Sequence, residues 1–202
     1  MRTTEQQLLL GEWACLGILY PGPSHGFAIA ARLKPTGDVG RVWSMSRALT
    51  YRALDQLASR DFIHVVGEEP GLAGGNRTIL AATRSGRAQL RKWLNTPVAH
   101  LRDVRSELLL KLIIADICGI GIGPMLDRQH AHIEQLAESI AGQVDDGAPI
   151  DVVDLWRNES SQAALRFLAR VQAQVPSLST SQRCASATRR EISEAGIGRS
   201  MR

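Results

Sequence analysis

Three stretches near the start of the chain repeat their apolar residues every three or four positions, which is the spacing of a helix with one buried face. They cover residues 5–20, 24–34 and 45–63. The sequence PGP ends the first stretch, because proline cannot continue a helix. Ser24 is expected to cap the second helix and Ser44 the third. Three short helices with a tight turn between the second and the third predict a helix-turn-helix.

Two stretches with roughly alternating, partly β-branched residues follow the third helix and predict a pair of strands. They cover residues 62–69 and 77–83, and the glycine-rich stretch 70–76 between them predicts a turn. Thr83 is placed to cap a further helix, which reads RSGRAQLRKWL. A hairpin that directly follows three helices is a wing, so we expect a winged helix-turn-helix.

The same periodicity predicts which side of each helix is buried. The second helix is expected to bury Phe27, Ala30 and Leu33, and residues 41–43 are expected to form a short strand. The apolar side of the third helix consists of Ala48, Tyr51, Leu54, Leu57, Ala58 and Phe62. Its other side carries Ser46, Arg47, Thr50, Arg52 and Gln56. A small surface helix would normally show more Glu and Lys, so this second side calls for another explanation.

The chain beyond residue 98 is predicted to be helical and to bury much of its surface between helices. Residues 103–117 are apolar almost all round, and Pro124 suits the first turn of the next helix. Two narrow apolar seams follow: Leu126, Ile133, Ala137, Ile140 and Val144, then Val153, Trp156, Ala164, Phe167 or Leu168, and Val171. They predict an antiparallel helical hairpin. Because each seam offers more apolar surface than one partner helix needs, we also expect a homodimer.

These patterns predict a mostly α fold with a small β-hairpin wing. A winged-helix domain (residues 1–97) is followed by a helical dimerisation region (98–175) and a tail (176–202). The tail has six serines, no apolar period and a positive net charge, so it is expected to be disordered.

The net charge of +4 is unevenly distributed along the chain. Residues 1–97 hold 12 Lys and Arg against 7 Asp and Glu, whereas residues 98–175 hold 7 against 11. Residues 176–202 hold 5 against 2. This asymmetry indicates that the N-terminal domain meets a polyanion and that the central region has a different role.

Several function classes find no support in the sequence. No run of about 18 apolar residues predicts a membrane span. The three cysteines are far apart and lack CxxC spacing, which favours a cytoplasmic protein without a disulfide framework or zinc site. His130 and His132 would point to different sides of a helix and cannot share a metal ion. We therefore expect no catalytic residues, no metal and no cofactor.

Four segments together carry a family resemblance: ACLGILYPGPSHGFAIAARL, YRALDQLASRDFI, NRTILAATRSGRAQLRKWL and VRSELLLKL. In this order and spacing they are similar to the PadR family of bacterial transcriptional regulators, over residues 8–115. Two departures stand out: Leu80 to Ala82 where the family usually has Tyr followed by Leu, and Asp61 where it has glycine. The resemblance implies a domain that binds operator DNA, a helical dimerisation region, and repression relieved by small, often aromatic or lipophilic, molecules.

A recognition helix needs side chains that reach base edges and phosphates, and arginine and hydroxyl groups can do both. The predicted DNA-binding residues are Ser44, Ser46, Arg47, Tyr51, Arg52 and, on the wing, Arg77. Trp93 and Trp156 are candidate walls of an effector pocket. The sequence thus predicts a DNA-binding transcriptional regulator, a repressor that binds double-stranded operator DNA and is released from it by a small molecule. The alternative is a winged-helix module that docks onto another protein and does not bind DNA.

Overall fold

The computed structural model describes residues 7–70, 75–144 and 151–195. The chain divides after Met125 into two units. The elements of the first are α1 (Leu10–Leu19), β1 (Ser24–His25), α2 (Gly26–Arg32), α3 (Arg47–Ser59), β2 (Ile63–Pro70), β3 (Asn76–Ala82), α4 (Arg84–Leu94), the 3-10 turn η1 (Leu101–Asp103), the π-helical turn η2 (Val104–Leu108) and α5 (Leu109–Cys118). Helix α6 (Gly123–Val144), apart from its first residues, and α7 (Val152–Ala195) make up the second.

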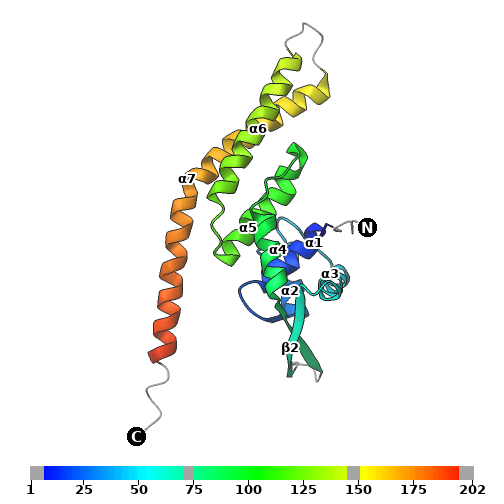
Figure 1. Ribbon diagram of the computed structural model, residues 1–202, viewed down its shortest axis with the longest axis vertical. Helices are drawn as coiled ribbons and strands as arrows, with labels where there is room; N and C mark the ends of the chain where they lie inside the picture. The colour runs from blue at the N-terminus through cyan, green and yellow to red at the C-terminus, as the bar shows by residue number, and fades with distance from the viewer. Residues whose placement is uncertain (1–6, 71–74, 145–150, 196–202) are drawn as a thin grey trace. The chain divides into compact units, whose positions relative to one another are not determined.

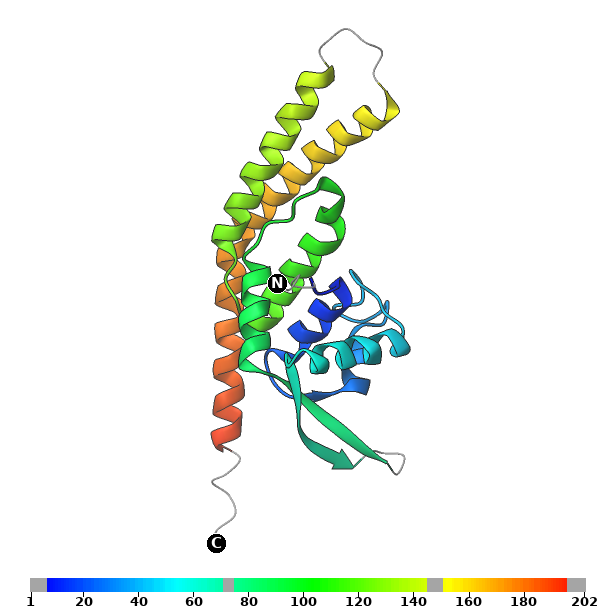
Figure 2. The ribbon, with the colours of Figure 1, turned by 45° about the vertical axis from the view of Figure 1, so that its right-hand side comes forward.

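The sheet of the first unit is antiparallel, with the strand order β1-β3-β2. Strands β2 and β3 pair from Ile63 opposite Ala82 to Pro70 opposite Asn76, with an irregularity between Val65 and Gly67. The hairpin that they form extends away from the helices of the same unit (Figures 1 and 2). This arrangement is a winged helix, and it confirms the predicted mostly α fold with a hairpin wing.

The strand that joins the hairpin to complete the sheet is not the one that the sequence predicts. Residues 41–43 lie in a turn, where the backbone amides of Val42 and Trp43 donate to the carbonyl of Val39 at 3.0 and 3.1 Å. Those amides are therefore not available to a strand ladder. The strand is instead Ser24–His25, which pairs with β3.

This pairing also changes the start of α2. Ser24 is part of the strand, and His25 caps the helix by accepting a hydrogen bond from the amide of Ala28 on its Nδ1 at 3.1 Å. Ala30 and Leu33 are buried as predicted. The prediction that Phe27 is buried was wrong: it is 49% exposed. Because the helix begins at Gly26, Phe27 falls in its first turn, on the outer side of the domain.

Helix α1 lies at the centre of the first unit. Ala14, Leu16 and Leu19 are completely buried, and the helix packs against α3, α4 and α5. Gly17 permits the approach to α5, since a Cβ at this position would lie only 2.5 Å from Cγ2 of Ile114. The predicted burial of the apolar helix after residue 103 follows from this contact.

In the second unit α6 and the first part of α7 run side by side in opposite directions, as the sequence predicts (Figure 2). Nε2 of Gln172 donates to Oδ1 of Asp127 at 2.8 Å, which joins the first turns of α6 to a point well along α7. The buried seam residues are Leu126, Ile133, Ala137, Ala164 and Leu168. Near the start of α7 the predicted seam is open to solvent, because Val153 and Trp156 are 46% and 72% exposed.

The structure differs from the predicted disordered tail. Helix α7 continues through residues 176–195, and residues 196–202 lie outside the described part of the chain. The prediction rested on the missing apolar period, which argues against burial but not against a helix. Alanine, arginine and glutamate make up eight of the twenty residues 176–195, and all three are good helix formers.

Candidate nucleic-acid interface

Helix α3 starts two residues later than the sequence predicts. Its N-cap is Ser46, whose Oγ accepts a hydrogen bond from the amide of Leu49 at 3.2 Å. Ser44 is exposed and lies before the helix. The predicted cap at Ser44 is therefore corrected to Ser46, and the hydroxyl of Ser46 is engaged with its own helix.

The buried side of α3 is formed by Thr50, Ala53, Leu54 and Leu57. Thr50, which the sequence places on the polar side, is completely buried because its hydroxyl donates to the carbonyl of Ser46 at 3.0 Å and needs no water. Ala48 and Ala58 are exposed, contrary to prediction. Tyr51 is 39% exposed and lies at the edge of the buried side.

A groove of about 660 Å³ lies between α3, the start of α2 and the sheet. Three of the predicted DNA-binding residues line it: Arg47 and Tyr51 from α3, and Arg77 from β3. Its walls also include His25 and Phe27. The structure thus brings together residues that lie 30 positions apart in the sequence, on the helix and the wing that the sequence assigns to DNA contact.

The ring of Phe27 is the point at which these arginines meet. The guanidinium carbon of Arg47 lies 5.4 Å from the centre of the Phe27 ring, and that of Arg77 lies 5.8 Å from the same centre. Arg47 is also 5.7 Å from the centre of the Tyr51 ring. These distances are those of cation–π contacts, which attract a cation to the face of an aromatic ring.

Tyr51 is held in the groove by a close approach to the start of α2. A Cβ on Gly26 would lie 2.8 Å from Cε1 of Tyr51, so only glycine leaves room for the ring. Gly26 follows His25 directly, and His25 is fixed both by the sheet and by its hydrogen bond to α2. The aromatic side of the groove therefore rests on the junction of β1 and α2.

The remaining predicted residues do not join this cluster. Ser44, Ser46 and Arg52 are exposed, but they do not line the groove. Arg52 lies on the outer surface of α3, where it is open to solvent. The structure therefore divides the predicted DNA-binding residues into a gathered set of Arg47, Tyr51 and Arg77 and three separate positions around the start of α3.

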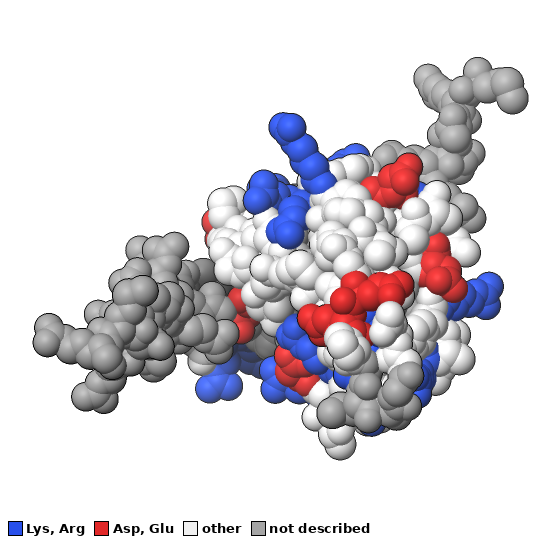
Figure 3. Space-filling model, turned by 90° about the horizontal axis from the view of Figure 1, so that it is seen from below, with Lys and Arg blue, Asp and Glu red and all other residues white. Residues whose placement is uncertain are grey.

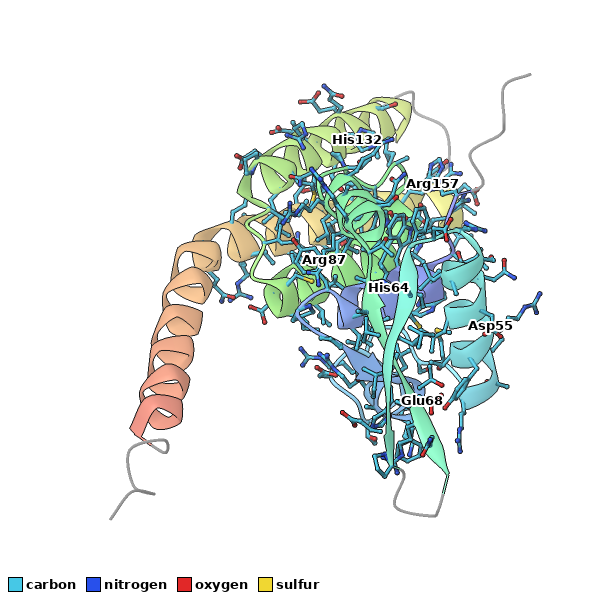
Figure 4. The ribbon with its side chains drawn as sticks, turned by 60° about the horizontal axis from the view of Figure 1, so that its bottom comes forward. Asp55, His64, Glu68, Arg87, His132 and Arg157 are labelled. Carbon is cyan, nitrogen blue, oxygen red and sulfur yellow. The ribbon has the colours of Figure 1, made fainter. Side chains whose placement is uncertain are left out.

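Acidic side chains lie among the basic ones on this face. Asp55 lines the groove from α3, and Glu68 accepts a hydrogen bond from Nδ2 of Asn76 on its Oε2 at 2.9 Å (Figure 4). Glu69 is the cross-strand partner of Arg77. Viewed from the end of the hairpin, basic and acidic groups are interspersed (Figure 3). The positive charge of the N-terminal domain is thus not spread as a uniform patch on this face.

The two tryptophans proposed for an effector pocket lie in different units. Trp93 is buried in the first unit, stacked on Trp13 with the ring centres 4.9 Å apart. Its Nε1 donates to Oε1 of Glu107 at 3.0 Å. Trp156 belongs to α7 in the second unit and is open to solvent.

Comparison with solved structures finds regulators of transcription. Bacillus subtilis PadR in complex with operator DNA is 19% identical, with a TM-score of 0.40 over 81% of this chain and 98% of that chain. The same protein with p-coumaric acid is 19% identical, with a TM-score of 0.40 over 83% and 99%. The PadR-like transcriptional regulator BC1756 from Bacillus cereus is 19% identical, with a TM-score of 0.38 over 86% and 99%. The chain is similar to PadR regulators. No family model and no curated protein matches it.

One of the two departures from the PadR pattern has a clear structural reason. Asp61, where PadR proteins usually have glycine, has a φ of 57°, in the left-handed region that favours glycine. Aspartate is among the few other residues that adopt this conformation readily. The carbonyl of Asp61 also accepts a hydrogen bond from Oγ1 of Thr83 at 2.7 Å, which ties the end of α3 to the start of α4.

Sequence reasoning missed Phe27 and Asn76 as groove residues. Periodicity alone places Phe27 in the core. The pairing of β1 with β3 delays the start of α2 to Gly26, and Phe27 then lies in its first turn on the outer side of the domain. A signal was available in the segment ACLGILYPGPSHGFAIAARL, which carries part of the PadR resemblance and in which Phe27 directly follows His25 and Gly26.

Two observations bear on other kinds of site. Across the described ranges, no three His, Cys, Asp or Glu side chains are arranged to hold a metal ion. None of the helices in those ranges combines the length and apolar character that crossing a bilayer requires.

Proposed function

We propose that this protein is a sequence-specific DNA-binding transcriptional regulator that acts as a repressor. The observation that carries the proposal is the meeting of Arg47 and Tyr51 from α3 with Arg77 from the wing in one groove. In a winged helix, the recognition helix enters the major groove while the wing reaches the adjacent backbone. One surface that presents guanidiniums from both elements fits this mode of binding.

The surroundings of these two arginines support the proposal. Among the residues that the structure describes, no carboxylate lies within salt-bridge distance of Arg47 or Arg77. Their charges are therefore free to neutralise phosphates or to pair with guanine O6 and N7. Asp55 and the wing glutamates repel phosphates, so only a duplex placed with its backbone against the arginines is favoured.

The test begins with a duplex pool of random sequence from which the full-length protein selects its site. Arg47→Ala should weaken binding to the selected duplex by about 1–3 kcal/mol, the cost of one lost base contact. Arg102→Ala is the matched control, because it removes the same charge from a side chain that is 80% exposed and outside the groove. Equal losses for both variants, or no selection of any sequence, would contradict the proposal.

We propose that the active form is a homodimer that binds a two-fold symmetric site with half-sites about one helical turn apart. Four neighbouring apolar side chains at the start of α7 support this: Val152, Val153, Leu155 and Trp156 are 74%, 46%, 50% and 72% exposed. An apolar patch of this kind on a helix is typical of a surface that a partner covers. A second copy brings a second recognition helix, as a symmetric operator requires.

We propose further that a small aromatic or lipophilic molecule releases the protein from its operator. The proposal rests on the PadR-like motifs of the sequence and on an exposed Trp156, which could form one side of an aromatic pocket in the dimer. It is tested on the DNA immediately upstream of the coding region, by measuring binding with and without a series of aromatic ligands. Binding that no ligand weakens would contradict it.

A further inference from the structure

We infer that Phe27 is a positioning residue for DNA recognition: its ring orients Arg47 and Arg77 before DNA arrives and couples the recognition helix to the wing. The inference rests on the proposed DNA-binding function and deepens it. Phe27 itself need not contact a base or a phosphate, since its role is exerted through the two arginines.

The location of Phe27 sets it apart from the other exposed apolar side chains. It lies on α2, whereas the arginines that it contacts lie on α3 and β3, so three elements meet at one ring. Phe27 remains 49% exposed even with both guanidiniums beside its ring. A side chain that served only the core would be expected to turn inward with Ile29 and Ala30, which are buried.

The backbone that carries Phe27 is fixed on its N-terminal side. His25 pairs with Ile79 in the sheet and accepts the hydrogen bond that caps α2. The ring of His25 lies 6.3 Å from that of Phe27, at an interplanar angle of 29°. Because Gly26 is in contact with Tyr51, the same junction also determines the distance between α2 and α3.

A free arginine samples many rotamers, and binding DNA in one of them has an entropic cost. A contact with an aromatic face reduces that cost before binding and leaves the positive charge intact. The guanidinium can still present its N–H groups at the edge of its plane to an acceptor. Phe27 should therefore favour a particular geometry of the arginines without changing how many phosphates they neutralise.

The experiment compares Phe27→Leu with Phe27→Tyr in the full-length protein. Phe27→Leu keeps an apolar side chain and removes the aromatic face, whereas Phe27→Tyr keeps the face. Leu9→Ala is the control, because Leu9 is 71% exposed in the same unit and does not line the groove. Each variant is titrated with the duplex selected by the wild type and with a scrambled duplex, and its thermal unfolding is recorded.

Phe27→Leu is expected to bind the selected duplex about fivefold more weakly, which corresponds to two lost cation–π contacts at exposed sites. Binding to scrambled duplex, the slope of affinity against salt and the unfolding midpoint should stay close to those of the wild type. Phe27→Tyr should bind like the wild type. Combining Phe27→Leu with Arg47→Ala should cost less than the sum of the two changes, since both act on the same contact.

Two results separate a failure of this inference from a failure of the proposed function. If the wild type selects a duplex and Phe27→Leu binds it equally well, the inference is overturned while the function stands. If the wild type binds no duplex, both are overturned. A loss in Phe27→Leu that appears equally on scrambled DNA, or that Phe27→Tyr shares, would also overturn the role of the ring.

Discussion

At the scale of single residues, the most demanding group in the first unit is the buried Lys111. Its side chain is 1% exposed, and its Nζ lies 2.9 Å from Oε1 of Glu107 and 2.6 Å from the carbonyl oxygen of Thr96. The ammonium also lies 5.1 Å from the centre of the Trp93 ring. Burial lowers the pKa of Lys111, and Glu107 opposes this by stabilising the charged form. Lys111 thus connects α5, the π-helical turn and the end of α4.

Lys111→Ala is expected to destabilise the fold by about 3–5 kcal/mol, because it leaves the partly buried Glu107 carboxylate without its cation. Lys111→Met combined with Glu107→Gln should cost clearly less, since neither an unpaired charge nor a large cavity remains. Urea unfolding measures both free energies, with Lys92→Ala on the exposed side of α4 as the control. A loss below about 1 kcal/mol for Lys111→Ala would show that the ion pair is dispensable.

At the scale of elements, α7 exposes apolar residues at its start and buries apolar residues further along, where it packs against α6. Ser161, Ala164 and Leu168 are buried in the second unit, whereas Leu155 and Trp156 are not. The same helix therefore changes from a covered to an uncovered apolar surface within a few turns. A second copy of the chain is the partner that we propose for the uncovered part.

Trp156→Ser should shift the dimer toward monomer, because a large apolar side chain at the centre of an interface contributes much of its binding free energy. We expect the dissociation constant measured by sedimentation equilibrium to rise at least tenfold. Arg166→Ser, an exposed position on the same helix, is the control. A wild-type protein that is monomeric at all concentrations would rule out the dimer, and a dimer unchanged by Trp156→Ser would place its interface elsewhere.

Elements set by local sequence could be predicted, whereas features set by distant pairing could not. Thr83 caps α4 as predicted, its Oγ1 accepting from the amide of Gly86 at 3.0 Å, whereas the predicted cap at Ser24 was wrong because Ser24 pairs with β3. The exposure of Phe27 depends on Ser24 pairing with Leu80, which lies far along the chain. The groove itself follows from that pairing. Arg47 and Arg77 were therefore predicted as separate contacts, and their shared aromatic partner was not.

At the scale of the whole molecule, the net charge of the N-terminal domain differs from the local charge around the groove. The first 97 residues carry an excess of five positive charges over negative ones. Around the groove, however, Arg47 and Arg77 lie near Asp55 and Glu69. A non-specific polyanion site would expose its cations without such neighbours. The mixed charge favours a partner whose phosphates are placed at defined positions, as they are in a duplex.

We propose that α3 and the wing bind double-stranded DNA through its phosphates and bases. The most direct test is the affinity of the full-length protein for its selected duplex, measured over a range of salt concentrations. The logarithm of the affinity should fall steeply and linearly with the logarithm of the salt concentration. Arg77→Ala should make this slope shallower by about one, because one phosphate contact is lost. Binding that does not change with salt would contradict the claim and favour a winged helix that docks onto another protein.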